Sequence, residues 1–312
     1  MLLSLLAYAS SQPPLPKWYL SGHRNFKPLL PMARECWAEK MCESDSRNCS
    51  FAGNGVICGL ERHAIHDIHT HLPPDAVVLE LGARFGTVSC AISRRQRDSG
   101  LVVSVEPDPK THVSLKLNMD HNGCKGIAVN GAVSQQRLFQ YWRVGGTATG
   151  YGNTRVLPTN CTGADPYLYG ARQGQWWCEP IERFTVDQLA LMLSDRVGRS
   201  VHFSALVIDC EGCLRRFMED ERTFLDDPQL QWIFYETDER NASLVRDMCN
   251  LGFSVLSNAR DCMTPAAPGL AQVVFKRNTP GETPFGCKSL WSGCDGKCKA
   301  ACGLVASTGV EG

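Results

Sequence analysis

The sequence predicts an α/β domain built on a doubly wound, mostly parallel seven-stranded sheet. Short apolar runs of strand length alternate with segments of helical period from residue 61 to residue 277. The first of these runs ends in a glycine-bounded turn, and the second ends in a carboxylate. Such alternation is typical of parallel strands joined by helical crossovers, with helices on both faces of the sheet.

The first half of the domain follows from its residue pattern, element by element. LERHAIHDIHTHL at 60–72 has a helical period, and two prolines stop it. AVVLELGARFG at 76–86 is a strand followed by a tight turn, and TVSCAISRRQRD at 87–98 places its apolar residues on one helical face. A second strand at 101–105, a helix at 111–118 and a third strand at 127–133 complete this half.

The second half begins with an insertion. Residues 135–180 lose periodicity and are rich in Gly, Thr, Tyr and Trp, so we predict a long segment with weak structure, of the kind that usually serves function. The regular pattern then resumes, with helices at 185–193, 213–220 and 242–251 and strands at 203–208, 231–235, 253–257 and 271–277.

Two extensions flank this domain. Residues 1–60 are rich in Pro, Cys, Asn and Gly and predict an irregular N-terminal extension. Residues 1–11 are a candidate signal peptide, although the basic residues that normally precede such an apolar run are missing. Residues 278–312 predict a separate Cys-rich tail.

The amino-acid composition limits the classes of binding partner but does not decide the cellular compartment. Lys plus Arg and Asp plus Glu both number 32, so no long-range field attracts nucleic acid or an anionic membrane. No apolar stretch after the N-terminus is long enough to span a bilayer. We therefore expect a small-molecule or glycan acceptor. The 16 cysteines and the sequons at Asn48, Asn160 and Asn241 favour the secretory pathway, whereas the missing basic residues favour the cytoplasm.

A cofactor site is predicted at the first crossover, because open α/β sheets bind ligands where a strand meets its helix. Glu106 ends the second strand, 24 residues after Gly82, where a carboxylate can accept hydrogen bonds from both hydroxyls of a ribose. The predicted cofactor-binding residues are Glu80, Gly82, Ala83, Arg84, Phe85, Gly86, Glu106, Pro107 and Ala132.

The turn favours S-adenosylmethionine over a dinucleotide. Arg84 occupies the position where a dinucleotide site needs its second glycine. The charge of Glu80 would suit an ammonium or sulfonium group and would repel a pyrophosphate. A nicotinamide-dependent oxidoreductase is the rival enzyme, and a non-catalytic module with the same fold is the rival outside enzymes.

Several blocks of sequence resemble, in order and spacing, the FkbM-type family of class I S-adenosylmethionine-dependent methyltransferases. The blocks are VVLELGARFGTVSCAIS, VVSVEPDPKTHVSLKLNMDHN, VNGAVS, RFTVDQLALML and FSALVIDCEGCLRRFM. The most diagnostic stretch is Thr-Val-Asp at 185–187 followed at a distance by Ile-Asp-Cys-Glu-Gly at 208–212, in which residues 209–212 match the family's Asp-x-Glu-Gly motif. The resemblance implies a class I fold with an antiparallel last strand and O-methylation of a sugar or secondary-metabolite hydroxyl. The chain departs from the family at Val207, where Lys is frequent, and at Arg84, where Asn is usual.

Carboxylates at strand ends are the candidate bases for deprotonating an acceptor hydroxyl. Asp209 and Glu211, after the fourth strand, are the first choices, and Glu236, after the fifth, is the second. Their alternative roles are to cap the following helix and to complement its dipole.

Two other patterns are interpreted as structural, and no metal site is predicted. The histidines His63, His66, His69 and His71 are interpreted as a polar surface near the cofactor mouth. Cys210 and Cys213 are interpreted as two core thiols.

Overall fold

The computed structural model describes residues 62–143, 154–157, 176–210, 213–237, 242–260 and 271–282. Its helices are α2 (Arg62–His71), α3 (Thr87–Arg95), α4 (Pro109–Asn122), α5 (Val186–Val197), α6 (Cys213–Asp220), α7 (Arg222–Asp226) and α8 (Ala242–Asn250). Its strands are β1 (Val78–Leu81), β2 (Val102–Glu106), β3 (Ile127–Asn130), β4 (Ala132–Val133), β5 (Phe139–Arg143), β6 (Thr154–Leu157), β7 (Trp176–Pro180), β8 (Arg183–Phe184), β9 (Ala205–Ile208), β10 (Trp232–Thr237), β11 (Phe253–Arg260) and β12 (Ala271–Arg277).

The main sheet confirms the predicted fold class. Its seven strands run in the order β11-β12-β10-β9-β1-β2-β3, and β12 is antiparallel to both of its neighbours while the remaining pairs are parallel. The crossovers build β1, β2 and β3 outward in one direction, and β9 and β10 outward in the other. The strand order therefore reverses between β1 and β9, which is the switch point where doubly wound sheets bind their ligands.

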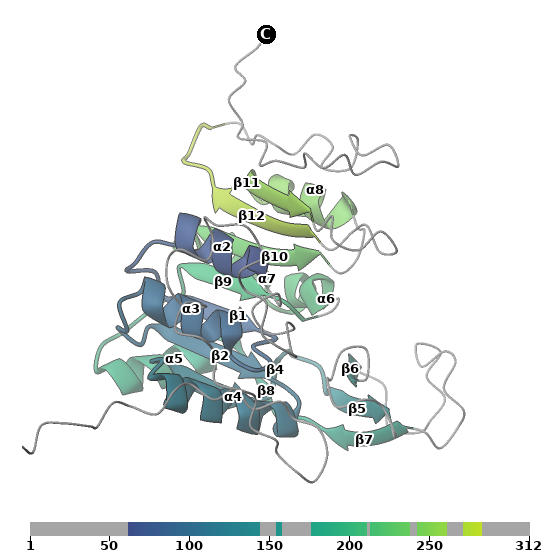
Figure 1. The fold of residues 1–312 in the computed structure, drawn as a ribbon. Coiled ribbons are helices and arrows are strands. Elements are labelled where there is room, and N and C mark those ends of the chain that lie inside the picture. Colours follow the sequence, from purple (N-terminus) through teal and green to yellow (C-terminus); the bar gives the residue numbers. More distant parts are fainter. Residues whose placement is uncertain are drawn as a thin grey trace, which may run out of the picture.

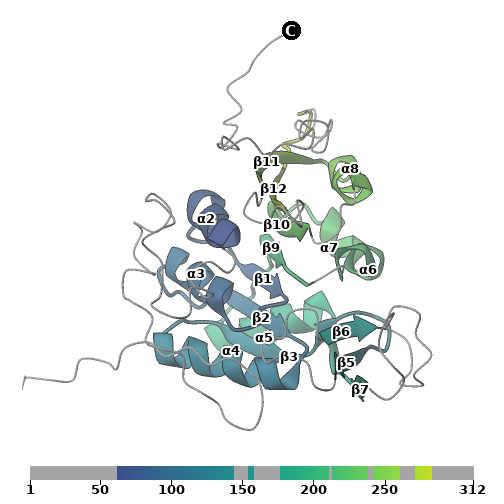
Figure 2. The same ribbon diagram turned by 45° about the vertical axis from the view of Figure 1, so that its right-hand side comes forward.

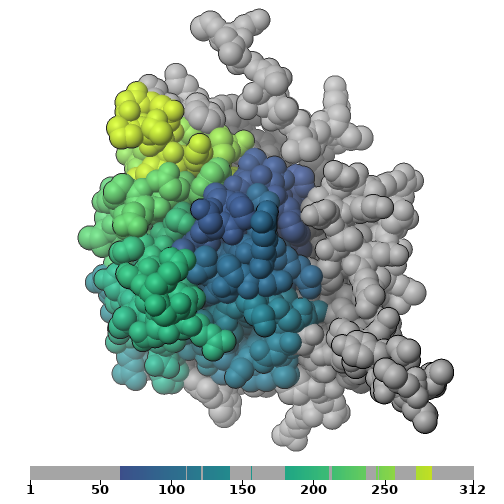
Figure 3. Space-filling view, turned by 90° about the vertical axis from the view of Figure 1, so that its left-hand side faces the viewer, coloured from purple at the N-terminus to yellow at the C-terminus, as the bar shows by residue number. Residues whose placement is uncertain are grey.

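Helices cover both faces of this sheet (Figures 1 and 2). Helices α2 and α3 pack on one face in one buried apolar cluster, and α5 to α8 contribute to a second cluster on the other face. All residues of β1 and β2 are buried as a result. In Figure 3 the purple atoms at the start of the described chain lie beside the green atoms of its C-terminal part, and α2 contacts β10 and β12.

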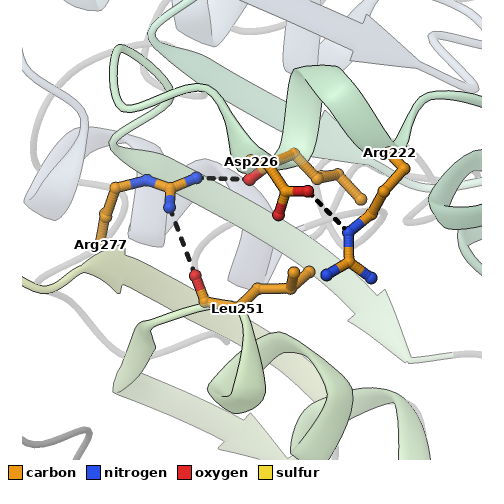
Figure 4. A network of polar contacts seen from close by, with 5 residues as sticks. Arg222, Asp226, Leu251 and Arg277 are labelled. Carbon is orange, nitrogen blue, oxygen red and sulfur yellow. Dashed lines mark hydrogen bonds and ion pairs between the residues drawn. The ribbon is translucent and has the colours of Figure 1, made fainter.

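Arg277 fastens the last strand to two helix ends (Figure 4). Its guanidinium donates hydrogen bonds to the carbonyl oxygens of Leu225, at 2.5 Å, and Leu251, at 3.3 Å, and its Nε donates to Leu230 at 2.7 Å. The same group lies 4.3 Å from the ring centroid of Phe253. A cation at helix carbonyl ends stabilises them, so this side chain joins α7, α8 and β12.

The insertion has more regular structure than the sequence predicts. Strands β6, β5 and β7 form an antiparallel sheet of their own, at the lower right of Figure 1. The single strand predicted at 127–133 is also wrong. It is broken after Asn130, and β4 leaves the main sheet to pair with β8. Helix α7 and strand β8 have no counterpart in the prediction, because such short elements are defined by tertiary contacts.

Two disulfides lie within the described residues. Cys90 in α3 is bonded to Cys124 after α4, and both are buried, with 0% and 7% exposure. Cys210 is bonded to Cys213, and both are partly exposed, so their interpretation as core thiols is wrong. The cysteines of the N- and C-terminal extensions lie outside the described residues. In the part of the chain that is described, no helix is both long and apolar enough to cross a membrane.

Candidate functional site

Polar residues form one row across the carboxyl edge of the main sheet. One position before this edge, the four neighbouring strands β2, β1, β9 and β10 carry residues that are in register and buried, namely Val105, Leu81, Ile208 and Tyr235. At the next position, Glu106 is in register with Asn130, and Glu236 is in register with Gln272. Continuing the register across the sheet gives a row of Asn130, Glu106, Gly82, Asp209, Glu236 and Gln272. The sheet thus changes from apolar to polar and charged residues at the edge where ligands bind.

Gly82 brings the turn after β1 into direct contact with the end of β9. Its φ is +83°, and a Cβ at this position would lie 2.6 Å from the carbonyl carbon of Asp209. The amide of Asp209 in turn donates to the carbonyl of Leu81 at 2.9 Å. Only glycine fits this backbone conformation and this spacing. The switch point is therefore built from Gly82, which was predicted to bind the cofactor, and Asp209, which was predicted as a candidate base.

Glu106 lies over the same turn. One carboxylate oxygen accepts the amide of Arg84 at 2.8 Å, and the other accepts the amide of Asp108 at 2.9 Å. The side chain is 7% exposed, and burial raises its pKa to about 7. A carboxylate has about four acceptor positions, so each oxygen keeps one for another donor. The carboxylate is thus held by backbone amides at the carboxyl edge of the sheet, and one acceptor position on each oxygen is left for another donor.

Two asparagines that the sequence analysis did not identify hold this turn region in place. Asn130 donates to the carbonyls of Glu106 and Pro107, at 2.9 and 3.1 Å. Buried Asn118 of α4 donates to the carbonyl of Phe85 at 2.8 Å. The available signal for Asn130 was its position directly after an apolar strand and before Gly131. Asn118 carried no signal, because its contact spans 33 positions of the chain.

Glu80 is directed into the protein. Its carboxylate accepts hydrogen bonds from the hydroxyls of Ser89 in α3, at 2.6 Å, and Ser104 in β2, at 2.5 Å. The side chain is 2% exposed, and desolvation raises its pKa to about 7 despite the two hydrogen bonds. In this structure Glu80 joins β1, α3 and β2 beneath the turn, and its predicted contact with a cationic ligand stays a prediction.

The amides of the turn are already used within the chain. Those of Gly82 and Ala83 both donate to the carbonyl of Val105, at 3.0 and 3.1 Å, and that of Gly86 donates to Ala83 at 2.9 Å. With the Arg84 amide bonded to the carboxylate of Glu106, these four amides do not offer a cradle for phosphate oxygens. Arg84 itself has a left-handed backbone, with φ of +51°, and its guanidinium lies 5.5 Å from the centroid of the buried Phe85 ring.

Pro107 and Ala132, which were also predicted to bind the cofactor, are both partly exposed but differ in the use of their backbone. Pro107 is partly exposed at the end of β2. Ala132 is partly exposed, but its amide donates to the carbonyl of Glu182 at 3.0 Å and so belongs to the pairing of β4 with β8.

The candidate bases lie on neighbouring strands. Asp209 and Glu236 are both partly exposed, and Tyr235 is in register with Ile208, so the two carboxylate-bearing residues follow at adjacent strand ends. Adjacent strands are about 4.8 Å apart, so the two residues lie side by side at the carboxyl edge of the sheet. Glu211 lies outside the described residues.

Two other features lie away from this edge. Helix α2 ends at His71, close to the start of β1, so this histidine is at the opposite end of the sheet from the glycine turn. Its pKa is lowered by burial and by the neighbouring His66. A cavity of about 470 Å³ is lined by residues that include Gly100 and Gly126, before β2 and β3, and it too is at the amino edge. Among the residues that the structure describes, no three potential metal ligands lie together.

No protein-family model and no curated protein sequence matches this chain. Among solved structures it is similar to TrmK of M. capricolum bound to S-adenosyl-homocysteine, with 4% identity, 69% of this chain and 68% of the other covered, and a TM-score of 0.40. It is similar to a Streptococcus agalactiae protein of the NADB-Rossmann superfamily (9% identity, 70% and 70% covered, TM-score 0.39). It is also similar to TYW2 of M. jannaschii bound to AdoMet (12% identity, 70% and 76% covered, TM-score 0.35). At these identities and TM-scores, cofactor and activity have to be inferred from the chain's own residues.

Proposed function

We propose that the chain is an S-adenosylmethionine-dependent methyltransferase that acts on a hydroxyl oxygen of a sugar or secondary metabolite. The observation that carries the proposal is the carboxylate of Glu106 beside the bare backbone of Gly82 at the switch point of the sheet. A glycine turn and an acidic residue at the end of the next strand are what an adenosine-containing ligand requires.

The hydrogen-bonding groups of the site favour S-adenosylmethionine over a dinucleotide. The turn amides from Gly82 to Arg84 are bonded within the chain, which removes the donors that a pyrophosphate would need. The carboxylate of Glu106 lies beside the turn, and the backbone of Asp209 contacts it, so two acidic residues near the turn would attract a ligand with a cationic end. When bound, the cofactor supplies an electrophilic methyl group on its sulfonium. Glu106 would hold its ribose hydroxyls, and Pro107 and Ala132 would border its base.

The task left to the chain is to align the acceptor and remove its proton. Alignment supplies much of the rate enhancement, and a positioned base adds roughly a hundredfold or more. Asp209 is the proposed base because it follows β9 in direct contact with the turn at Gly82. Glu236 on the neighbouring strand is the second candidate, and Glu211 is a candidate from sequence alone.

Titration calorimetry with separate samples of S-adenosylmethionine and NAD⁺ tests the cofactor. We expect heat of binding with the first and none with the second. Binding of NAD⁺ alone would make the chain an oxidoreductase. An assay for S-adenosylhomocysteine formed with hydroxyl acceptors then tests the activity. A protein that binds the donor and forms no product with any acceptor would be a binding module.

A further inference from the structure

The Cys210–Cys213 disulfide differs from the other described disulfide in its access to solvent. Both of its cysteines are partly exposed, and their Cα atoms are 5.5 Å apart. Cys90 and Cys124, in contrast, are 0% and 7% exposed. A thiol in solution must reach a sulfur atom to break a disulfide, so the Cys210–Cys213 bond is the more accessible of these two.

The position of Cys213 favours thiol chemistry. It is the first residue of α6, an eight-residue helix, so its sulfur lies at the positive end of the helix dipole. A helix N-terminus stabilises the thiolate that is released when a disulfide is reduced, and pairs with two intervening residues are the usual redox-active arrangement. The geometry therefore provides both access and a stabilised leaving group.

The pair is also in contact with the proposed cofactor turn. Asp209 directly precedes Cys210, and a Cβ at Gly82 would lie 2.6 Å from the Asp209 carbonyl carbon and 3.1 Å from the Cα of Cys210. No space separates the two segments, so a backbone shift at Cys210 must be accommodated at Gly82. The disulfide fixes Cys210 to the start of α6 and thereby fixes that contact.

We propose that Cys210 and Cys213 form a reversible thiol–disulfide site that is reduced by a dithiol and that controls how the turn at Gly82 packs against β9. One thiolate of the dithiol attacks a sulfur of the pair, the protein S–S bond breaks, and a mixed disulfide forms. The second thiol of the reductant displaces the remaining cysteine, which leaves two protein thiols and one oxidised, cyclic reductant. The oxidised pair holds the turn in the described conformation. The effect on cofactor binding rests on the proposed function, whereas the thiol–disulfide chemistry does not.

The first experiment measures the chemistry alone. The full chain is equilibrated with increasing dithiothreitol, free thiols are trapped with iodoacetamide, and peptides are quantified by mass spectrometry. We expect Cys210 and Cys213 to become alkylated at a dithiothreitol concentration at least about tenfold below that needed for Cys90 and Cys124. Reduction of both pairs together, or later reduction of Cys210 and Cys213, would overturn the proposal.

The second experiment measures the effect on the turn without any ligand. Hydrogen exchange of the peptide that contains Gly82 to Gly86 is compared between the oxidised chain and the chain reduced selectively at Cys210 and Cys213. We expect faster exchange after reduction in this peptide and no change in β11, which lies at the far edge of the sheet. Equal exchange of the turn in both forms would show that the pair does not control it.

The third experiment links the pair to the cofactor. Reduction is expected to weaken S-adenosylhomocysteine binding by about fivefold or more, and saturating S-adenosylhomocysteine must then protect the disulfide from reduction by the same factor. The Cys210→Ser/Cys213→Ser variant should bind as weakly as the reduced chain and ignore dithiothreitol. Equal affinity in both redox forms would refute the link. If neither form binds S-adenosylhomocysteine while the first two results hold, the proposed function fails and the thiol–disulfide site stands.

Discussion

Replacing Glu106 with glutamine tests the assignment on which the proposed cofactor site depends. The carboxylate accepts the amides of Arg84 and Asp108, one on each oxygen, and retains one acceptor position per oxygen for the ribose hydroxyls. Glutamine keeps one acceptor oxygen and replaces the other with an NH₂ group that faces a backbone N–H. We therefore expect one ribose hydrogen bond to be lost and one backbone amide to be left unpaired.

The expected magnitude follows from these contacts. A hydrogen bond to a charged acceptor contributes about 1.5–3 kcal/mol, so the loss should be roughly 2–3 kcal/mol. That corresponds to a roughly 30- to 150-fold rise in the Kd for S-adenosylmethionine.

The pKa of Glu106, raised to about 7 by burial, adds a second readout. The hydroxyl donors of a ribose favour the ionised carboxylate. Wild-type affinity should therefore fall by up to about tenfold per pH unit below pH 7. The glutamine variant should lose this pH dependence.

Titration calorimetry at pH 6 and pH 8 measures both effects. Glu221→Gln is the matched control, because Glu221 is also 7% exposed and has a raised pKa from burial but lies between α6 and α7. Its affinity should stay within about threefold of wild type, since no ligand hydrogen bond is removed. An unchanged Kd in Glu106→Gln, or an equal loss in both variants, would refute the assignment of Glu106 to the ribose.

Four further outcomes are expected. The pKa of Glu80 is about 7 in the folded chain, above its ordinary value of 4.5, so its contribution to stability is complete below pH 4.5 and is lost as the pH rises through 7. Glu80→Gln should therefore reduce the fall in unfolding free energy between pH 5 and pH 8 by about 2–3 kcal/mol in urea titrations, and an identical fall in both proteins would contradict this. Arg84→Asn should stabilise the chain by about 0.5–1 kcal/mol in thermal unfolding, because asparagine tolerates the left-handed backbone better, whereas a loss would show that the guanidinium contacts outweigh the strain. Asp209→Asn should lower turnover by about a hundredfold while the Kd for S-adenosylmethionine changes by less than about threefold, and unchanged turnover would remove Asp209 from the mechanism. Arg277→Met should cost about 2–4 kcal/mol of unfolding free energy in the same urea assay, since it leaves helix carbonyls unpaired, and a cost below about 0.5 kcal/mol would mean that water replaces the guanidinium.

The core of the fold could be predicted because its signals are local. The apolar run before Gly82 and the helical period after it specify a strand, a turn and a helix from adjacent residues. Glu106 could be identified by its distance along the chain from Gly82, because the length of one crossover sets which strand end faces the turn. Both predictions use only the order of residues. The strand, turn and helix agree with the structure, and Glu106 lies at the end of β2 as expected, whereas its contact with a ribose stays a prediction.

The features that were missed depend on contacts between distant segments. Strands β5, β6 and β7 pair across the insertion, and no local pattern predicts antiparallel pairing between segments so far apart in the sequence. The direction of the Glu80 side chain depends on hydroxyls in α3 and β2 that a sequence does not bring together. The Cys210–Cys213 bond was missed because the choice between thiols and a disulfide is set by exposure and geometry, and the sequence contains neither.

The covalent ring closed by Cys90 and Cys124 keeps the segments that carry Gly82 and Glu106 joined when the backbone between the two cysteines is cut. Arg97 and Asp98 lie inside this ring, in an exposed loop with left-handed backbone at both residues, and the bridged cysteines are 34 positions apart. A protease that cuts this loop produces two pieces, one with Gly82 and Cys90 and the other with Glu106 and Cys124. The disulfide keeps the two pieces joined, so no fragment is released. Such a nicked molecule migrates as one species on a gel until a reductant separates it into two.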